Sequence, residues 1–202
     1  MVIIENIDQG STEWMTIKAG IPSASEFDKI LSPTGKASTQ AEKYRNQLIG
    51  ERLLGIKPEG YKSQAMIEGS AKEDEARAYF STLYGVECKQ VAFCFEDNKR
   101  YGCSPDTLLD MTGLEIKCPE LHTQVQYLMD NKLPTIYIPQ VQGSMLISGY
   151  SHWFFMSYYP GLPKLIIDVP RDDKYCAQLK VLLNDFCDDL DNEYIKLKAR
   201  LG

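Results

Sequence analysis

The residues of this chain best suited to chemistry are two acids and a base close together in the sequence, Asp106, Glu115 and Lys117. Glu115 and Lys117 lie in the run Leu-Glu-Ile-Lys, and residues two apart on a β-strand point to the same face. A Ser-Pro-Asp turn places Asp106 just upstream, within reach of the same point. Two carboxylates suit a hard cation such as Mg²⁺, and the lysine could orient a water or neutralise a phosphate oxygen. The set therefore favours metal-dependent hydrolysis of phosphodiesters.

A second interpretation of the strand pair is a solvated ion pair with no function, and the pair alone does not separate the two. The run Leu-Glu-Ile-Lys-Cys-Pro favours a site, because a solvated strand usually carries more polar residues on its outer face.

Glu73 has two interpretations as well. It could reach the strand from a neighbouring helix, or form an exposed acidic face with Asp74 and Glu75, paired with Arg77 four residues later. Only the neighbouring strand motif favours the interpretation in which Glu73 reaches the strand.

The tripeptide Gln-Val-Gln occurs at residues 124–126 and again at 140–142. The second copy lies among apolar residues, so we expect Gln140 to be more buried and better hydrogen-bonded than Gln124. Tyr137 would share the helix face of Gln140. Lys18 lies at a predicted helix end, just before the serines that open the next helix, and such backbone amides bind anions. Helix-capping serines beside a solvated lysine are the alternative.

Size and composition indicate one globular domain over residues 1–202, with 44% apolar and 25% charged residues. The net charge of −6 argues mildly against a nucleic-acid partner, but residues 1–64 are balanced, with eight acids and eight bases. The chain has no apolar run as long as a membrane span and no signal-peptide pattern, so we expect a cytoplasmic protein without membrane contact. Its six scattered cysteines indicate free thiols rather than a zinc or iron–sulfur site.

The periodicity predicts helices and strands in an α/β order. Helices are expected at residues 11–18, 23–31, 39–54, 64–84, 121–130, 136–149 and 171–200. Strands are expected at residues 86–95, 100–103, 113–118, 152–159 and 164–169. Ser23 with Glu26, and Thr39 with Glu42, have the spacing of helix capping boxes. This order predicts a central mixed β-sheet flanked by helices on both faces.

Five motifs in this order resemble the lambda exonuclease family of phage recombination nucleases, within the restriction-endonuclease-like superfamily. They are Trp14…Lys-Ala-Gly-Ile-Pro-Ser-Ala-Ser25, Gly69…Glu73-x-x-Ala-Arg77, Cys-Ser-Pro-Asp106, Leu-Glu115-Ile-Lys117-Cys-Pro119 and Tyr137-x-x-Gln140-Val-Gln-x-Ser-Met. Together they span most of the chain. The sequence departs from the family at Lys18, where arginine is commoner, and at Thr107, where glycine is commoner.

The resemblance assigns roles to the residues of these motifs. It implies that Asp106, Glu115 and the Ile116 carbonyl hold two Mg²⁺ ions, for which Mn²⁺ would substitute, with Glu73 close by. It implies that Lys117 positions or activates the water, and that Gln140 and Tyr137 orient water and phosphate. A pocket for a terminal 5′ phosphate would be formed by Lys18, Ser25, Arg45 and Ser104.

The function implied by the resemblance is a Mg²⁺-dependent 5′-to-3′ exonuclease of phage or prophage origin. It would degrade one strand of linear duplex DNA with a 5′ phosphate to mononucleotides and leave 3′ overhangs for recombination by strand annealing. A homotrimer and a single-strand annealing recombinase as partner are also implied. The alternatives are a structure-selective endonuclease or Cas4-like nuclease of the same fold, a catalytically inert DNA-end-binding module, and an acidic protein-interaction domain.

Overall fold

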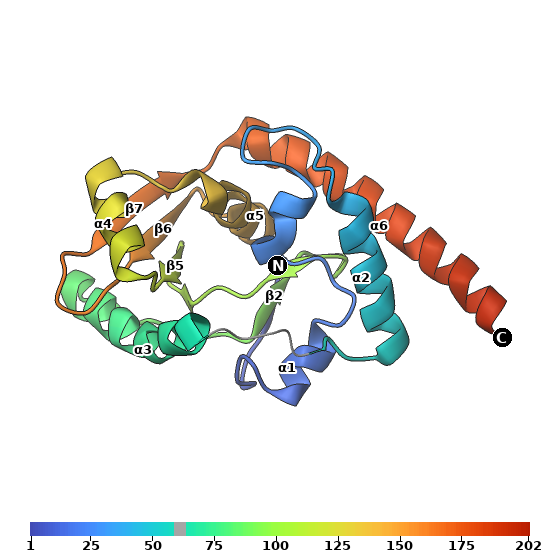
Figure 1. Ribbon diagram of the computed structural model, residues 1–202, viewed down its shortest axis with the longest axis horizontal. Coiled ribbons are helices and arrows are strands. Elements are labelled where there is room, and N and C mark those ends of the chain that lie inside the picture. Colours follow the sequence, from blue (N-terminus) through green and yellow to red (C-terminus); the bar gives the residue numbers. More distant parts are fainter. Residues whose placement is uncertain (59–63) are drawn as a thin grey trace.

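The computed structural model describes the backbone of residues 1–58 and 64–202, and the side chains of residues 1–58 and 72–202. The described strands form two sheets (Figure 1). The smaller sheet is antiparallel, with the order β1 (Val2–Ile4), β2 (Phe93–Phe95) and β3 (Gly102–Cys103). The larger sheet has the order β4 (Thr107–Leu108), β5 (Gly113–Lys117), β6 (His152–Ser157) and β7 (Leu165–Pro170). It is mixed, because β5 and β6 are parallel and the other neighbours are antiparallel.

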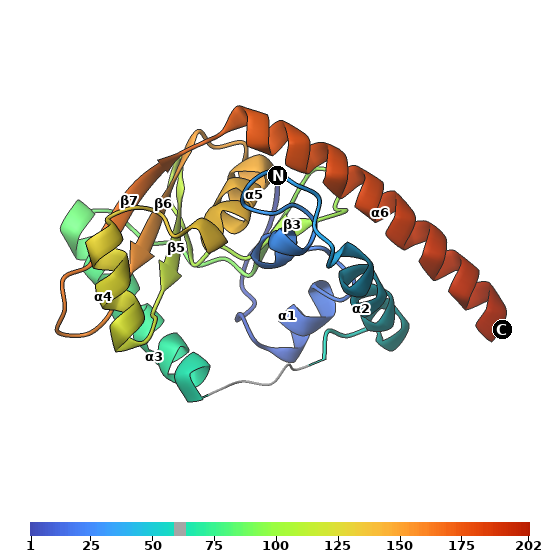
Figure 2. The same ribbon diagram turned by 45° about the horizontal axis from the view of Figure 1, so that its top comes forward.

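Helices surround both sheets. They are α1 (Thr12–Ile17), the 3₁₀ helix η1 (Ala24–Lys29), α2 (Ala41–Leu54), α3 (Gln64–Tyr84), α4 (Leu121–Asp130), the 3₁₀ helix η2 (Thr135–Tyr137), α5 (Ile138–Ser148) and α6 (Asp173–Leu201). In Figure 1, α6 runs along one edge of the molecule beside α2, and its C-terminal end extends beyond the body. Figure 2 shows α5 in the middle of the molecule, where it contacts β6, η1 and α6. No helix in the described part of the chain is both long and apolar enough to cross a membrane.

The alternation of β5 decides which of its side chains face which helix. Leu114 and Ile116 point to one side, where they are buried against Ala76 and Phe80 of α3. Phe155 of β6, which pairs with Glu115, is packed on the opposite side in the core that includes α5. The strand therefore buries its apolar residues on α3 and directs Glu115 and Lys117 toward α5.

The predicted α/β architecture with a mixed sheet flanked by helices is confirmed, but the strands form two sheets rather than the single sheet expected. Pro105 lies between β3 and β4, and a proline cannot donate a ladder hydrogen bond. After it the chain pairs β4 with β5 rather than continuing β3. The expected strand at 86–95 is regular only over Phe93–Phe95. Strands β1 and β4 were not predicted, because two or three residues give no periodic signal.

Both predicted capping boxes are wrong. Ser23 precedes a 3₁₀ helix, its Oγ has no hydrogen-bond partner among the described residues, and Glu26 forms an ion pair with Lys29 instead. Helix α2 begins after Gln40, with no side-chain cap. In contrast, Ser11 caps α1 by accepting from the Trp14 amide at 3.2 Å. The bounds of the helices expected at 64–84 and 121–130 are confirmed.

Candidate active site

The structure joins Glu115, Lys117 and Gln140 through one carboxylate oxygen. The Glu115 side chain is buried, with 2% of its surface exposed. Its Oε1 lies 2.5 Å from the Lys117 ammonium and accepts a hydrogen bond of 2.6 Å from Gln140 Nε2. Strand β5 supplies the first two residues and α5 the third. The pairing of acid and base expected from their spacing on the strand is therefore present, and the glutamine reaches it from the neighbouring helix.

Asp106 is held by two hydrogen bonds, one from the backbone of β5 and one from Arg77 of α3. Its Oδ2 accepts from the Ile116 amide at 2.6 Å, and its carbonyl accepts from Arg77 Nε at 3.1 Å. Arg77 also donates to Asp74, at 2.6 Å. The expected alternative, in which Arg77 pairs with Glu73, is therefore not what the helix forms. Arg77 of α3 instead holds the turn that presents Asp106, a role that its spacing from Glu73 did not indicate.

The backbone of Ile116 is turned toward Asp106. The Lys117 carbonyl accepts from the Tyr158 amide of the β6 side at 2.9 Å, whereas the Ile116 amide donates to Asp106 on the other side of β5. Along a strand the N–H and C=O of one residue point to the same side, and this side alternates from residue to residue. The Ile116 carbonyl therefore faces the side of β5 on which Asp106 lies.

Glu73 of α3 completes the acidic surroundings of Asp106. Its side chain is half-buried, and burial, followed by the charge of Asp106, raises the pKa of Glu73 to about 7, although Lys117 opposes the shift. An acid whose pKa responds to both Asp106 and Lys117 lies close to the strand site. The position expected for Glu73 is therefore supported, and only Asp74 and Glu75 of the acidic run are exposed.

Burial and mutual charge shift the pKa values of Glu115, Asp106 and Lys117. Burial raises the pKa of Glu115 to about 7, with Lys117 opposing the shift and Asp106 adding to it. Burial also raises the pKa of Asp106, against the opposing charge of Lys117 and the Ile116 hydrogen bond. Burial alone would lower the pKa of Lys117, but the carboxylates of Glu115 and Asp106 outweigh it and raise this pKa. The lysine is thus held as a cation between acids that repel one another.

Tyr137 covers this group from η2. Its ring stacks on Phe155 with centroids 5.3 Å apart, and the Lys117 ammonium lies 5.2 Å from the Tyr137 ring centroid. Tyr137 and Gln140 also line a recess of about 230 Å³, together with Ala24, Ser25, Asp28, Ile136 and Pro139. Asp28 was not expected here, and no motif pointed to it.

The expectation that Gln140 is more buried than Gln124 is wrong. Gln124 is fully buried and donates to the carbonyls of Ser157 and Pro163, at 3.3 and 3.0 Å. Gln140 is only partly buried. The apolar neighbours in the sequence did not reveal this, because α4 buries Gln124 against the end of β6. Gln140 nevertheless is the copy that contacts Glu115.

The residues expected to bind a 5′ phosphate are divided among three places. Lys18 Nζ donates to Ser104 Oγ at 3.3 Å, so these two lie together. Ser25 is exposed in the recess beside Tyr137 and Gln140. Arg45 is not brought to either place, because its guanidinium pairs with Asp189 of α6 at 2.5 Å.

Asp106, Glu115 and the Ile116 carbonyl provide oxygen ligands of the kind that Mg²⁺ prefers. Among the side chains of residues 1–58 and 72–202, no group of three or more His, Cys, Asp and Glu is placed to hold a metal ion. Two acids suffice for Mg²⁺, which usually keeps several waters. A divalent ion would also offset the repulsion by which Asp106 raises the pKa of Glu115. The residues present therefore fit a divalent cation. All six cysteines are free thiols.

The chain is similar to solved exonuclease structures. One is an alkaline exonuclease from Laribacter hongkongensis, with a TM-score of 0.84 and 29% identity over 94% of this chain and 99% of that chain. The same protein in complex with dAMP gives a TM-score of 0.83, with the same identity and coverage. A phage-related exonuclease from Haemophilus somnus 129PT, at 13% identity over 90% of this chain and 96% of that chain, shares the fold with a TM-score of 0.66.

Among proteins with curated descriptions, none matches this chain. The model of the YqaJ-like viral recombinase domain matches residues 13–151, which include every motif of the candidate site. This confirms the expected relationship to the phage recombination nucleases. The chain belongs to the YqaJ-like viral recombinase family.

Proposed function

We propose that this protein is a metal-dependent exonuclease that degrades one strand of linear duplex DNA from the 5′ end, releasing mononucleotides and leaving 3′ overhangs. The observation that carries the proposal is the meeting of Glu115, Lys117 and Gln140 at one oxygen, with Asp106 held on the same strand. The similarity to an alkaline exonuclease supports it. The complex of that relative with dAMP, a deoxynucleoside monophosphate, is consistent with mononucleotide products.

In hydrolysis, some of these residues would neutralise charge on the phosphate and others would orient the attacking water. Divalent ions held by Asp106, Glu115 and the Ile116 carbonyl, with Glu73 beside them, would supply positive charge to the scissile phosphate. Lys117 is fixed by Glu115 and remains protonated, so its ammonium can orient the attacking water and neutralise a phosphate oxygen. The amide of Gln140 aligns the same water, and the ring of Tyr137 covers Lys117.

Recognition of the DNA end would use the residues beside this site. Lys18 and Ser104 would hold the terminal 5′ phosphate, since Ser104 lies two residues before Asp106. Ser25 would contact the terminal nucleotide in the recess next to Tyr137. We include in the proposal a homotrimer, an annealing recombinase as partner, and a role in phage recombination. Arg45 is left out of the phosphate site because it pairs with Asp189.

The proposal is tested with end-labelled linear duplexes incubated with Mg²⁺, with Mn²⁺ or with chelator. We expect labelled mononucleotide from a 5′-labelled strand, progressive shortening from the 5′ end of a 3′-labelled strand, and no product with chelator. A closed circular duplex should remain intact. Nicking of the circle would instead indicate an endonuclease, and binding without any product in either metal would indicate an inert end-binding module.

A further inference from the structure

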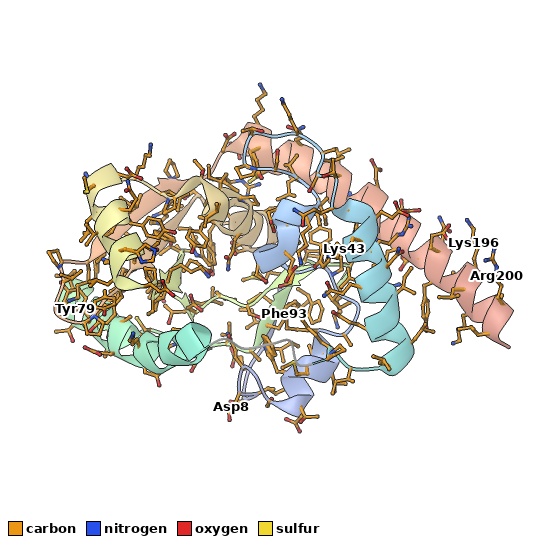
Figure 3. The ribbon with its side chains drawn as sticks, viewed as in Figure 1. Asp8, Lys43, Tyr79, Phe93, Lys196 and Arg200 are labelled. Carbon is orange, nitrogen blue, oxygen red and sulfur yellow. The ribbon has the colours of Figure 1, made fainter. Side chains whose placement is uncertain are left out.

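Lys18 is a buried lysine in aromatic surroundings. It is 5% exposed, and its ammonium lies 3.9 Å from the Trp14 ring centroid and 5.4 Å from that of Phe93. Phe93, labelled in Figure 3, lies on β2 in the middle of the molecule. Trp14 is itself fixed, since its Nε1 donates to the Ala92 carbonyl at 2.9 Å. The site of Lys18 is therefore rigid and mostly apolar.

Little in this site compensates the charge of Lys18. An ammonium has three N–H donors, and the described residues supply one acceptor, Ser104 Oγ at 3.3 Å. No carboxylate in residues 1–58 or 72–202 forms an ion pair with it. A buried cation without a counter-ion is costly, so the site favours either the neutral amine or an anion from outside.

The titratable groups around Lys18 come from three other parts of the chain. Lys57 follows α2, Cys103 ends β3, and Glu51 lies on α2. Glu51 is engaged elsewhere, because its carboxylate accepts from the Gly20 amide and from Gln47, both at 3.0 Å. Burial and the charge of Lys57 lower the pKa of Lys18 to about 7, against the smaller opposing effects of Cys103 and Glu51. The hydrogen bond with Cys94, followed by burial, raises the pKa of the Cys103 thiol well above its ordinary value, so the thiol stays neutral.

We propose that Lys18 couples recognition of the 5′ phosphate to the uptake of one proton, so that the preference for phosphorylated ends weakens as the solution becomes alkaline. This inference rests on the proposed function. An arginine at this position would stay charged at every accessible pH and would offer a bidentate fork. The lysine that replaces it in this chain can lose its charge inside the protein.

The proton balance follows from simple electrostatics. Above neutral pH the free protein holds Lys18 as an amine, and the terminal phosphate arrives as a dianion. The amine takes a proton from solvent, and the resulting ammonium pairs with the phosphate, because a nearby anion favours the charged form. Below pH about 7 Lys18 is already charged, so phosphate binding is at full strength. Above it, affinity for the phosphate falls by up to about tenfold per pH unit.

The test compares two duplexes that differ only in a 5′ phosphate or a 5′ hydroxyl. The ratio of their kcat/KM values is measured from pH 6 to pH 9.5. Titration of Glu73, Glu115 or other shared groups affects both substrates alike and cancels in the ratio. We expect the ratio to be constant up to about pH 7 and then to fall by up to about tenfold per unit.

Two variants separate charge from position. Lys18→Arg should keep the preference for the phosphorylated end and make the ratio independent of pH. Lys18→Met, which suits the apolar surroundings, should bring the ratio close to one at every pH. The methionine variant decides the matter if the larger arginine disturbs folding.

Calorimetry of DNA binding with chelator present gives a readout that needs no turnover. At pH 8.5, titrations in buffers with different heats of ionisation should show about one proton taken up with the phosphorylated duplex and none with the hydroxyl duplex. A constant ratio together with no proton uptake would overturn the inference, while leaving the exonuclease proposal intact. An enzyme that degrades neither duplex refutes the proposed function, and proton uptake would then still decide the role of Lys18.

Discussion

Lys18 is buried and Lys117 is partly buried, and both belong to the same proposed active region, yet their pKa values shift in opposite directions. Burial by itself would lower the pKa of each lysine. Lys117 lies 2.5 Å from Glu115 and also feels Asp106, and these carboxylates reverse the effect of burial. Lys18 has aromatic rings and a hydroxyl instead. The charge of a buried lysine is therefore decided by its immediate partners.

The sizes of the interaction energies explain why one nearby carboxylate is enough to keep a buried lysine charged. Two unit charges about 4 Å apart interact by roughly 4 kcal/mol at an effective dielectric constant of 20, which corresponds to about 3 pKa units. This matches the size of the desolvation effect at a well-buried site. A cation over an aromatic ring gains only about 0.5–2 kcal/mol, so Trp14 cannot replace a carboxylate. Lys117 is thus suited to constant charge, and Lys18 to a charge that depends on its ligand.

The largest effect is expected from Lys117→Met. Removing the fixed ammonium should lower kcat on linear duplex DNA by about 10³- to 10⁴-fold, while DNA affinity measured with chelator changes little. Steady-state kinetics and fluorescence anisotropy measure the two quantities. The matched control is Lys132→Met, an exposed lysine after α4, which should leave both unchanged. Turnover of the Lys117 variant within tenfold of the parent would remove the lysine from the mechanism.

The second prediction concerns the pH dependence of stability without metal or DNA. The pKa of Lys18 is lowered from 10.5 to about 7, so between these values the unfolded chain binds more protons than the folded one. Its contribution to the free energy of unfolding therefore rises with pH, by about 1.4 kcal/mol per unit. Lys117, with a raised pKa, contributes stability that is present below 10.5 and lost above it.

Urea unfolding of the parent and of Lys18→Met from pH 7 to pH 10 measures the contribution of Lys18 to the pH dependence of the free energy of unfolding. The methionine variant should be the more stable at pH 7, by about 2–4 kcal/mol, and the difference should shrink steadily toward pH 10. Parallel stability profiles would mean that Lys18 keeps its charge in the folded protein. The two lysines would then differ in their position but not in their charge.

The local pattern of β5 could be predicted from the sequence because a strand alternates with a period of two. Leu114 and Ile116 against Glu115 and Lys117 fix the buried and functional faces whatever the rest of the fold. The helix at 64–84 is confirmed for a similar reason, since its pattern is long and Gly85 adopts the left-handed conformation (φ +64°) that ends a helix.

Other features depend on partners far along the chain and left no local signal. Arg45 faces α6 because α2 packs on α6, so its motif position did not reveal Asp189 as its partner. The split into two sheets depends on pairings of two or three residues. The role of Arg77 in holding the Asp106 turn needs contacts between α3 and the segment before β4. Burial of Gln124 likewise depends on carbonyls more than thirty residues away.

The two glutamines give the smallest and most selective test of the Lys117 region. Gln140 shares Glu115 Oε1 with Lys117, so Gln140→Leu should lower kcat by about tenfold, or about 1.4 kcal/mol, with little loss of stability. Gln124→Leu removes buried hydrogen bonds to two carbonyls and should lower the free energy of unfolding by about 1–3 kcal/mol, with kcat retained. Kinetics and urea unfolding on both variants form a crossed design. If Gln124→Leu lost activity and Gln140→Leu lost only stability, the water-aligning role would belong to the first Gln-Val-Gln copy.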